Sequence, residues 1–471
     1  MSAGAQPIHP PLSEAEMRGN GPGATVRKPR NIVICCDGTG NEFGDTNSNV
    51  VKLYTTLEVD AAQVAYYHPG VGTMGDPNQQ HRLGREWSRI KGLAFGAGFK
   101  ANVLDAYRYL MESYSDGDRV YLIGFSRGAY TVRALAGLLD GYGLLCRGNE
   151  GHLPYAWRLY VNQHDVRTRN AINPTVDSAA AFKETFSHEN FRIHFVGVWD
   201  TVSSVGWVYT PLRLFNVAQN KTIATGRQAV SIDERRCFYQ DNLWGESLPG
   251  QDVVQVWFAG VHSDVGGSYP QESSGLSNIP LQWMLVQAHE AGIKLAPDRV
   301  KLVLGEPTAV YPACQPLYEK PKSATVHKSL TGLWWLLEVL PHIFYDKDRG
   351  KELHRIPFGA WRQIPDGALV HSSVVHRLKD SGAGYSPRNL AVADLTEWTS
   401  GPKDPAGKPI LYVHSAPTPS VEKKAWTRPL LLWSVSVVEI LLGLVVAFFA
   451  LKGCGWAGLY LWRVLVRLGG G

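Results

Sequence analysis

Short apolar runs of strand length alternate along the chain with longer segments whose apolar residues recur every three or four positions. The runs that are typical of buried strands cover residues 31–36, 120–123, 193–198 and 253–258. Helical stripes of apolar residues are found at residues 99–115 and 127–139. Together they predict an α/β fold with a mainly parallel sheet and helices on both faces. Sites in such sheets form beyond the carboxyl ends of the strands.

Composition limits the classes of function. The 471 residues are 44% hydrophobic and 19% charged, so they can bury one large domain or two smaller ones. The net charge of +5 is spread thinly, without the Lys/Arg clusters of a nucleic-acid surface, so we expect no nucleic-acid partner. The six cysteines show neither paired metal spacing nor the density of a disulfide scaffold, which indicates reduced and mostly buried thiols.

The two ends of the chain differ from its centre. Residues 1–29 are rich in Pro, Gly and polar residues and predict a disordered arm without a signal peptide. Residues 430–451 carry a single charge, Glu439, over 22 positions, enough to cross roughly 30 Å of hydrocarbon as a helix; a buried core helix is the alternative. Residues 452–471 fit an interfacial tail. We therefore expect a single-pass membrane protein, anchored at its C-terminus, with a cytoplasmic catalytic domain.

The centre of the chain divides into two predicted parts. Residues 30–300 form a catalytic domain, and residues 301–415 form an accessory region that completes it. Within that region, residues 329–345 hold a dense apolar segment interrupted by Pro341. The segment is too short to span a bilayer, so it predicts an apolar lid, an interfacial helix or a core helix of a small subdomain.

A serine lies between two glycines directly after one of the predicted strands. Gly124-Phe125-Ser126-Arg127-Gly128 has the pattern G-x-S-x-G, with a strand before it and a helix after it, as a nucleophile elbow requires. The glycines allow the sharp turn, and the amide of Arg127 is placed to stabilise an oxyanion at the start of the helix. A tight glycine turn capped by serine is the structural alternative.

A nucleophilic serine needs a histidine base and an acid that orients it. Asp200 and His262 each follow a predicted strand and stand in the chain order Ser, Asp, His that this type of site uses. Asp264 is the rival orienting acid, but only two residues from His262 it is better suited to fixing the loop. Asp200 alone also fits a helix cap.

A second glycine loop follows the first strand. Asp37, Gly38 and Thr39 come directly after residues 31–36, and we expect the amides of Gly38 and Thr39 to act as oxyanion donors while Asp37 holds the loop. Asp-Gly-Thr after a strand also occurs at phosphate sites, so Asp37 is alternatively a phosphatase nucleophile or metal ligand. That reading lacks the usual second aspartate, since Thr39 stands in its place.

Seven sequence blocks between residues 28 and 295 occur in the order seen in a known family. They are "ICCDGTGNEFGDTNSNV", "YYHPGVGT", "YLIGFSRGAYTVRALAGLL", "VGVWDTVSSVGW", "SIDERRCFY", "VWFAGVHSDVGGSYP" and "LSNIPLQWMLVQA". The chain thereby resembles the α/β-hydrolase group that includes the catalytic domain of type VI secretion phospholipase effectors. The resemblance implies a triad of Ser126, Asp200 and His262 and hydrolysis of lipid esters, with phospholipids as a plausible substrate.

The expected function is therefore a membrane-anchored serine hydrolase of the lipase or phospholipase type. Its chemistry needs neither a metal nor an organic cofactor, and its partner is a lipid or ester substrate. Two alternatives stay open: an inert membrane scaffold or binding protein on the same fold, and a metal-dependent phosphatase built on Asp37 and His262. The sequence leaves the oligomeric state, the head group and the bond position undetermined.

Overall fold

The structure is a computed structural model that describes most of the chain between residues 27 and 415. The described residues are 27–38, 46–70, 96–162, 176–202, 217–270, 273–304, 325–332, 334–339, 342–346, 351–380, 384–404 and 407–415, with short pieces at 44, 206–207, 210–211, 214 and 382. Almost all of the predicted N-terminal arm, residues 1–29, lies outside them. The predicted membrane helix at 430–451 and tail at 452–471 also lie outside them.

A nine-stranded sheet forms the centre of the described residues, in the order β12-β13-β11-β8-β7-β4-β3-β1-β2. Neighbouring strands are parallel from β2 through to β11, and only β13 and β12 at one edge are antiparallel. The strands are β1 Asn31–Cys36, β2 Gln63–His68, β3 Arg119–Phe125, β4 Ile193–Trp199, β7 Ile223–Ser231, β8 Asp252–Phe258, β11 Leu369–His371, β12 Leu395–Glu397 and β13 Leu411–His414. The predicted mainly parallel sheet is confirmed.

β1 is buried on both faces of the sheet, which explains why it is an almost continuous apolar run. In β1, Ile32 and Ile34 pack into the core on one face, while Val33 and Cys35 pack into the core on the other. Side chains alternate between faces along a strand, so a strand such as β1 that is covered on both sides is apolar at almost every position.

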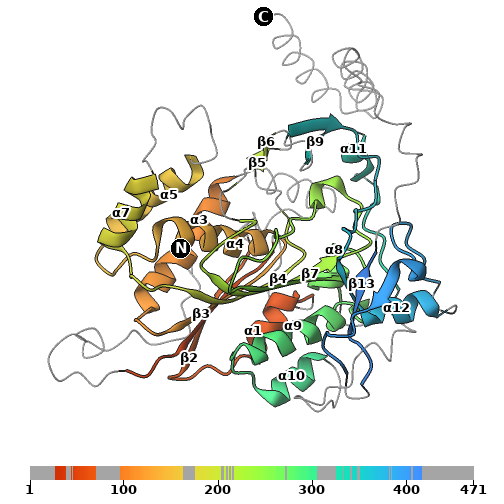
Figure 1. The fold of residues 1–471 in the computed structure, drawn as a ribbon, viewed down its shortest axis with the longest axis horizontal. Helices are drawn as coiled ribbons and strands as arrows, with labels where there is room; N and C mark the ends of the chain where they lie inside the picture. The colour runs from red at the N-terminus through yellow and green to blue at the C-terminus, as the bar shows by residue number, and fades with distance from the viewer. Residues whose placement is uncertain are drawn as a thin grey trace, which may run out of the picture. The chain divides into compact units, whose positions relative to one another are not determined.

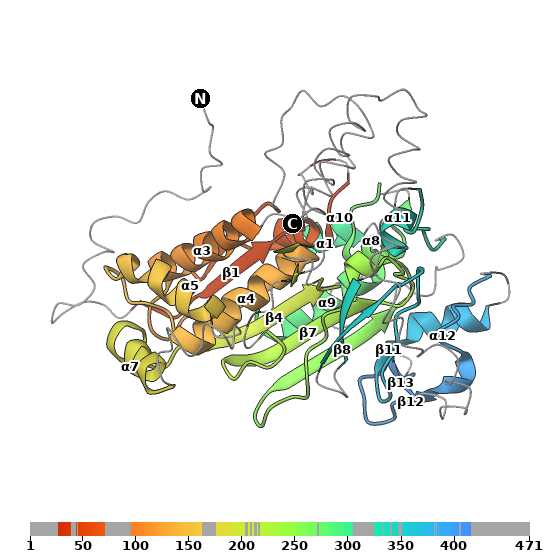
Figure 2. The ribbon, with the colours of Figure 1, turned by 90° about the horizontal axis from the view of Figure 1, so that it is seen from above.

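Helices cover the two faces (Figures 1 and 2). One face carries α3 Gly96–Ser113, α4 Arg127–Tyr142, α5 Leu153–Asn162 and α7 Val176–Phe186. The other carries α1 Asn49–Thr56, α9 Asn278–Glu290 and α10 Pro297–Leu304. The remaining helices of the described residues are η2 Glu150–His152, η3 Cys237–Tyr239, α8 His262–Gly266, α11 Trp334–Glu338, α12 Ser372–Lys379 and η8 Val392–Asp394. The helices predicted at 99–115 and 127–139 correspond to α3 and α4.

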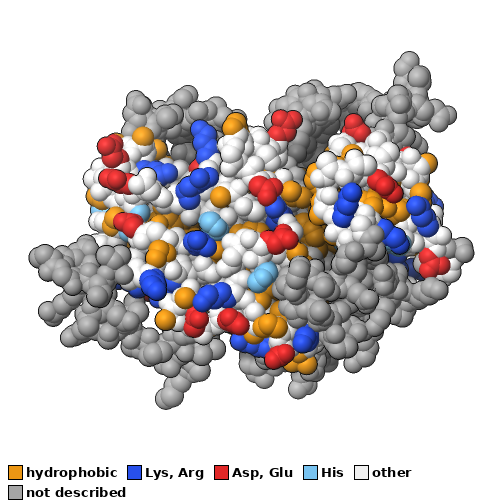
Figure 3. Space-filling model, turned by 60° about the horizontal axis from the view of Figure 1, so that its bottom comes forward, with side chains coloured by type: hydrophobic (Ala, Val, Ile, Leu, Met, Phe, Trp, Pro, Cys, Tyr) orange, Lys and Arg blue, Asp and Glu red, His pale blue; other side chains and the backbone are white. Residues whose placement is uncertain are grey.

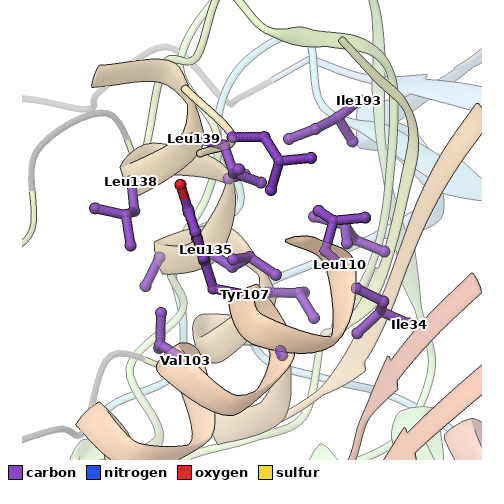
Figure 4. Packing of buried hydrophobic residues seen from close by; sticks show 14 of the residues in the cluster. Ile34, Val103, Tyr107, Leu110, Leu135, Leu138, Leu139 and Ile193 are labelled. Atoms are coloured by element: carbon purple, nitrogen blue, oxygen red, sulfur yellow. The ribbon is translucent and has the colours of Figure 1, made fainter. Parts of the chain in front are cut away.

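The larger core lies between α3, α4 and the sheet. Figure 4 shows buried side chains of both helices meeting side chains of the sheet, with labels on Ile34, Val103, Tyr107, Leu110, Leu135, Leu138, Leu139 and Ile193. The one polar atom among these side chains is satisfied, because the hydroxyl of Tyr107 donates to Gly143 O (2.8 Å) and accepts from Leu145 N (2.8 Å). This core fixes α4 on the sheet, and α4 begins beside Ser126.

The chain beyond residue 300 extends the sheet at one edge. β11 pairs with β8, and β13 and β12 follow it outward. Val370 and Val374 pack there against Trp257 and Val230 in a third apolar cluster. Two short antiparallel pairs lie outside the main sheet, β5 Gly206–Trp207 with β6 Thr210–Pro211, and β9 His342–Asp346 with β10 Lys351–Arg355. The predicted segment boundaries at 300 and 415 stay predictions.

The apolar segment at 329–345 contains a short helix followed by a strand, and its role as a lid, an interfacial helix or a core helix stays a prediction. Its helix, α11, has five residues and ends at Glu338, and β9 begins at His342. The sequence contains the reason, since Pro341 has no amide hydrogen to donate to a continuing helix. Trp335 in α11 is 43% exposed.

The predicted localisation at a membrane, with a cytoplasmic catalytic domain, is corrected by the structure. None of the helices in the described residues is long and apolar enough to cross a bilayer. Even α3, with 18 residues, carries the charged residues Lys100, Asp105, Arg108 and Glu112. The segment at 430–451, on which the prediction rested, lies outside the described residues.

Charges of both signs are interspersed on the face drawn in Figure 3. Lys and Arg side chains alternate there with Asp and Glu side chains, and the described residues of this face form no broad field of one sign. This distribution agrees with the thin spread of the net charge along the sequence.

Two glycines in α4 provide a test of how this helix packs on β1. A methyl group on Gly128 would lie 2.1 Å from the carbonyl oxygen of Cys36, whereas one on Gly141 would meet nothing within 4 Å. We expect Gly128→Ala to lower the free energy of unfolding by more than about 2 kcal/mol, because backbone must move. Gly141→Ala should leave it unchanged or raise it by up to about 1 kcal/mol. Denaturant unfolding measures both, and equal effects would contradict the packing described.

Candidate active site

Ser126 occupies a strained position between β3 and α4. β3 ends at Phe125 and α4 begins at Arg127, so the serine forms the whole turn. Its φ of 58° lies in the left-handed region, where a residue with a side chain costs about 1 to 3 kcal/mol. Its amide donates to Trp199 O (3.1 Å), which holds the turn against β4. Such strain, retained at a sharp turn, is typical of a functional position.

The glycines on either side of Ser126 are required by close backbone contacts. A Cβ on Gly124 would lie 2.7 Å from Ala129 Cα and from Gly128 O. A Cβ on Gly128 would strike Cys36 O in the neighbouring strand β1. The supporting role predicted for both glycines therefore has a steric basis: helix α4 approaches the two strands too closely for any larger residue.

His262 lies within hydrogen-bonding distance of Ser126. It is the first residue of α8, in the turn after β8, and its Nε2 is 2.8 Å from Ser126 Oγ. Phe125 stacks on the imidazole at 4.7 Å between ring centroids, and Tyr239 contacts it edge-on at 4.6 Å. The backbone amide of His262 donates to Glu234 Oε2 (3.2 Å). Rings and amide together fix the direction in which the imidazole points.

Asp200 lies on the other side of the imidazole from Ser126, so the three residues form one row of hydrogen bonds. It follows β4 directly, and its Oδ2 is 2.6 Å from His262 Nδ1. Its own amide donates to Ala229 O (2.7 Å), and its Oδ1 accepts from Ser231 N (2.9 Å). An ionised carboxylate only accepts, so Nδ1 carries the hydrogen and Nε2 is left to accept from the serine hydroxyl. The structure thus brings the three predicted residues together.

Burial and neighbouring charges set the ionisation of this row. Burial opposes the charge of Asp200, but Arg362 and the hydrogen bond from His262 outweigh it and hold the pKa of Asp200 well below its usual range. Burial also lowers the pKa of His262, only partly offset by Asp200 and Glu234. At neutral pH the carboxylate is therefore ionised and the imidazole neutral, as a general base requires.

Glu234 supplies a second buried carboxylate beside His262. It accepts from both the Nε (2.9 Å) and the Nη2 (2.8 Å) of Arg236 and also from Ser329 Oγ (3.1 Å). Burial alone would raise the pKa of Glu234, but Arg236 holds it at about 2. The guanidinium of Arg236 lies over the ring of Tyr239 at 3.8 Å and over that of Trp334 at 4.9 Å. The ion pair of Glu234 and Arg236 therefore connects the site to Trp334 in α11.

Asp264 lies beside the row without contacting its imidazole. Its carboxylate accepts from Val261 N (3.0 Å), from His327 N (3.1 Å) and from the His327 ring at Nδ1 (2.6 Å). These bonds tie the His262 loop to residues 325–332. Asp264 is therefore placed to hold the loop, while Asp200 is the acid in contact with His262.

The loop after β1 is fixed by Asp37, which is 2% exposed. Asp37 Oδ2 accepts from Ser48 Oγ (2.6 Å) and from the hydroxyl of Tyr67 (2.9 Å), and its Oδ1 accepts from Gly38 N (2.6 Å). The amide of Gly38 is thus bonded to Asp37 and would have to exchange partner to meet an oxyanion. Thr39 lies outside the described residues.

The geometry of Asp37 bears on the phosphatase alternative. Both of its oxygens accept hydrogen bonds from its own loop and the neighbouring elements, which is the pattern of a carboxylate that holds a loop. In the part of the chain that the structure describes, no group of three or more His, Cys, Asp or Glu side chains is arranged to hold a metal ion.

Two charged residues at this site, Glu234 and Arg362, are not found by sequence reasoning. Glu234 stands inside the quoted block "SIDERRCFY" after β7, a strand that we do not predict because Gly226, Arg227 and Gln228 interrupt its apolar pattern. Arg362 lies in an irregular stretch with no motif around it. Recognising β7 as a central strand would have drawn attention to the residues at its end; for Arg362 the sequence offers no such signal.

The sequence matches a known protein family. A family model described as the catalytic domain of Tle1-like phospholipase effectors of the type VI secretion system matches residues 30–287, more than half of the chain. The chain belongs to this family. The matched residues contain Ser126, Asp200 and His262 but end before Arg362.

Individual relatives were found as well. The chain is 36% identical over 228 residues to the uncharacterized protein YEL023C of Saccharomyces cerevisiae; the match covers 46% of this chain and 33% of that protein, so the chain spans about a third of its relative. Among solved structures, an uncharacterized protein from Pseudomonas aeruginosa is 20% identical with a TM-score of 0.34, covering 58% of this chain and 47% of that one. The Tle1 effector bound to the VgrG spike is 17% identical with a TM-score of 0.29, covering 53% and 52%. Both TM-scores are too low to compare the folds in detail.

Proposed function

We propose that the protein is a serine hydrolase of the α/β-hydrolase type that cleaves carboxylic esters of lipids, with phospholipids as its substrate class. The observation that carries the proposal is the unbroken row of hydrogen bonds from Ser126 Oγ through His262 to Asp200, at 2.8 and 2.6 Å. Membership of the phospholipase effector family supports the choice of a lipid ester. The proposed chemistry uses no metal or organic cofactor.

The proposed mechanism follows from the atoms in that row. His262 Nε2 removes the proton from Ser126 Oγ as the oxygen attacks the ester carbonyl, and Asp200 stabilises the imidazolium. The amide of Arg127, at the start of α4, faces the negative charge that develops on the carbonyl oxygen. Such a donor contributes roughly 3 to 4 kcal/mol. His262 then returns the proton to the leaving alcohol, and water cleaves the acyl-enzyme in the same way.

A single substitution tests the nucleophile. With p-nitrophenyl esters and phospholipid micelles as substrates, we expect Ser126→Ala to lower kcat by about 10⁴- to 10⁶-fold, because no other hydroxyl lies in the row. Ser187→Ala is the matched control: this buried hydroxyl only donates to Tyr142 O (2.7 Å), so its loss should leave turnover intact.

The same assay separates the alternatives. Turnover that survives a chelator and vanishes in Ser126→Ala supports the proposal. Chelator-sensitive release of phosphate would point to a phosphatase instead, and no turnover on any ester would point to an inert scaffold or binding protein.

The pH dependence tests the base. His262 acts only when neutral, and a buried imidazole whose pKa is lowered stays neutral further into acid. The acid limb of kcat/KM should therefore have its midpoint below pH about 6.5, the ordinary value for histidine, and the rate should be level at neutral pH. A pH–rate profile measures this, and a midpoint above pH about 7 would show that a different group is the base.

A further inference from the structure

Asp200 contacts a second cationic side chain in addition to His262. Arg362 donates from Nη1 to Asp200 Oδ1 (2.6 Å) and from Nη2 to Asp200 Oδ2 (3.1 Å), a fork on both oxygens. Oδ2 is the same atom that contacts His262 Nδ1. The guanidinium and the imidazole are therefore separated by one shared oxygen. Both Asp200 and Arg362 are buried, at 0% and 7% exposure.

The guanidinium of Arg362 is itself held in place from two further elements. Its Nη1 donates to Ser231 Oγ (2.7 Å) and Ser231 O (3.1 Å) at the end of β7, and its Nη2 donates to Tyr239 O (2.5 Å) in η3. Its carbonyl oxygen accepts from Asn389 Nδ2 (3.1 Å). A planar fork fixed by this many acceptors leaves the carboxylate of Asp200 a single orientation.

We propose that Arg362 is a positioning residue of the hydrolytic site: it aims Asp200 Oδ2 at His262 and, by its charge, limits how strongly His262 holds the proton taken from Ser126. This inference rests on the proposed function. Arg362 touches neither the serine nor the imidazole, so it acts through Asp200 alone. The residue comes from beyond the span matched by the family, residues 30–287.

The charges around His262 show why the guanidinium matters for proton transfer. Two carboxylates lie next to His262: Asp200 contacts the imidazole and Glu234 accepts from the backbone amide. Each is paired with a guanidinium, that of Arg362 and that of Arg236 respectively. Other titratable groups lie nearby: Tyr239 in η3, Asp264 in α8, Asp241 after η3 and Asp233 after β7. Without Arg362, Asp200 would be uncompensated and the imidazolium would be favoured.

Arg133 provides a comparison within the same chain. It is as buried as Arg362, but its guanidinium donates to Val217 O (2.8 Å), to Asn242 O and to Gln228 Oε1 (3.3 Å), with no carboxylate among these acceptors. A buried arginine can thus serve packing without a charge partner. Losing it should affect stability and leave the imidazole of His262 unchanged.

The experiment compares Arg362→Met, which removes both charge and fork, with Arg362→Lys, which keeps the charge and loses the fork. NMR of protein with labelled histidine, with the signal assigned through His262→Gln, measures the pKa of His262, and ester kinetics measure kcat and KM. In Arg362→Met we expect the pKa of His262 to rise by about one unit. We also expect kcat to fall about 10- to 100-fold at unchanged KM, because the carboxylate is no longer aimed.

Arg362→Lys separates the two contributions. In this variant the pKa of His262 should stay within about 0.3 unit of its wild-type value, since the positive charge remains. Its kcat should still fall about 10-fold, because an ammonium cannot hold both carboxylate oxygens in the planar geometry of a guanidinium. Arg133→Met, the control, should lower the free energy of unfolding without moving either the pKa of His262 or kcat.

Each outcome is decisive. A folded Arg362→Met with wild-type kcat and wild-type pKa of His262 overturns the inference. If that variant does not fold, Arg362→Lys decides, and wild-type kcat there overturns it. If the wild type shows no turnover dependent on Ser126, the proposed function fails, while the NMR comparison still decides whether Arg362 controls the imidazole.

Discussion

The candidate site depends on one row of short hydrogen bonds, from Ser126 to His262 to Asp200, formed where three parallel strands end. β3, β4 and β8 each deliver one of these residues, and β7 lies between the last two. Parallel strands end at the same edge of a sheet, so the register of the sheet sets the distances in the row. The stability of the site is therefore inseparable from the packing of helices that keeps these strands aligned.

Charge burial is the constraint that this row imposes on its surroundings. Taking Asp200 out of water is costly unless a cation and hydrogen bonds compensate it, and Arg362 supplies both. The same solution recurs with Glu234 and Arg236 one strand away. In the two pairs each largely buried carboxylate is matched by a guanidinium, and beside them a neutral imidazole lies against a serine hydroxyl.

Sequence reasoning finds the parts of the site that obey a local rule. Ser126, Asp200 and His262 each follow an apolar strand, and glycines flank the serine, so pattern alone places them at one edge. The strand β7 is not predicted, because polar residues interrupt its apolar pattern. The functional residues that follow it are therefore not predicted either. Arg362 carries no local pattern, since its role is created only when residues 162 positions apart meet. Within residues 329–345 the sequence already indicates where a helix must stop, because Pro341 interrupts the apolar segment, and α11 ends at Glu338.

The most direct test of the central claim is the reaction of Ser126 with a fluorophosphonate, followed by peptide mapping of the adduct by mass spectrometry. Formation of the adduct shows whether the Ser126 hydroxyl is activated, independently of any choice of lipid. We expect a single adduct on the peptide that contains Ser126, and its loss in folded His262→Ala although the serine is still present. An unmodified Ser126 in the wild type, or equal labelling in His262→Ala, would contradict it.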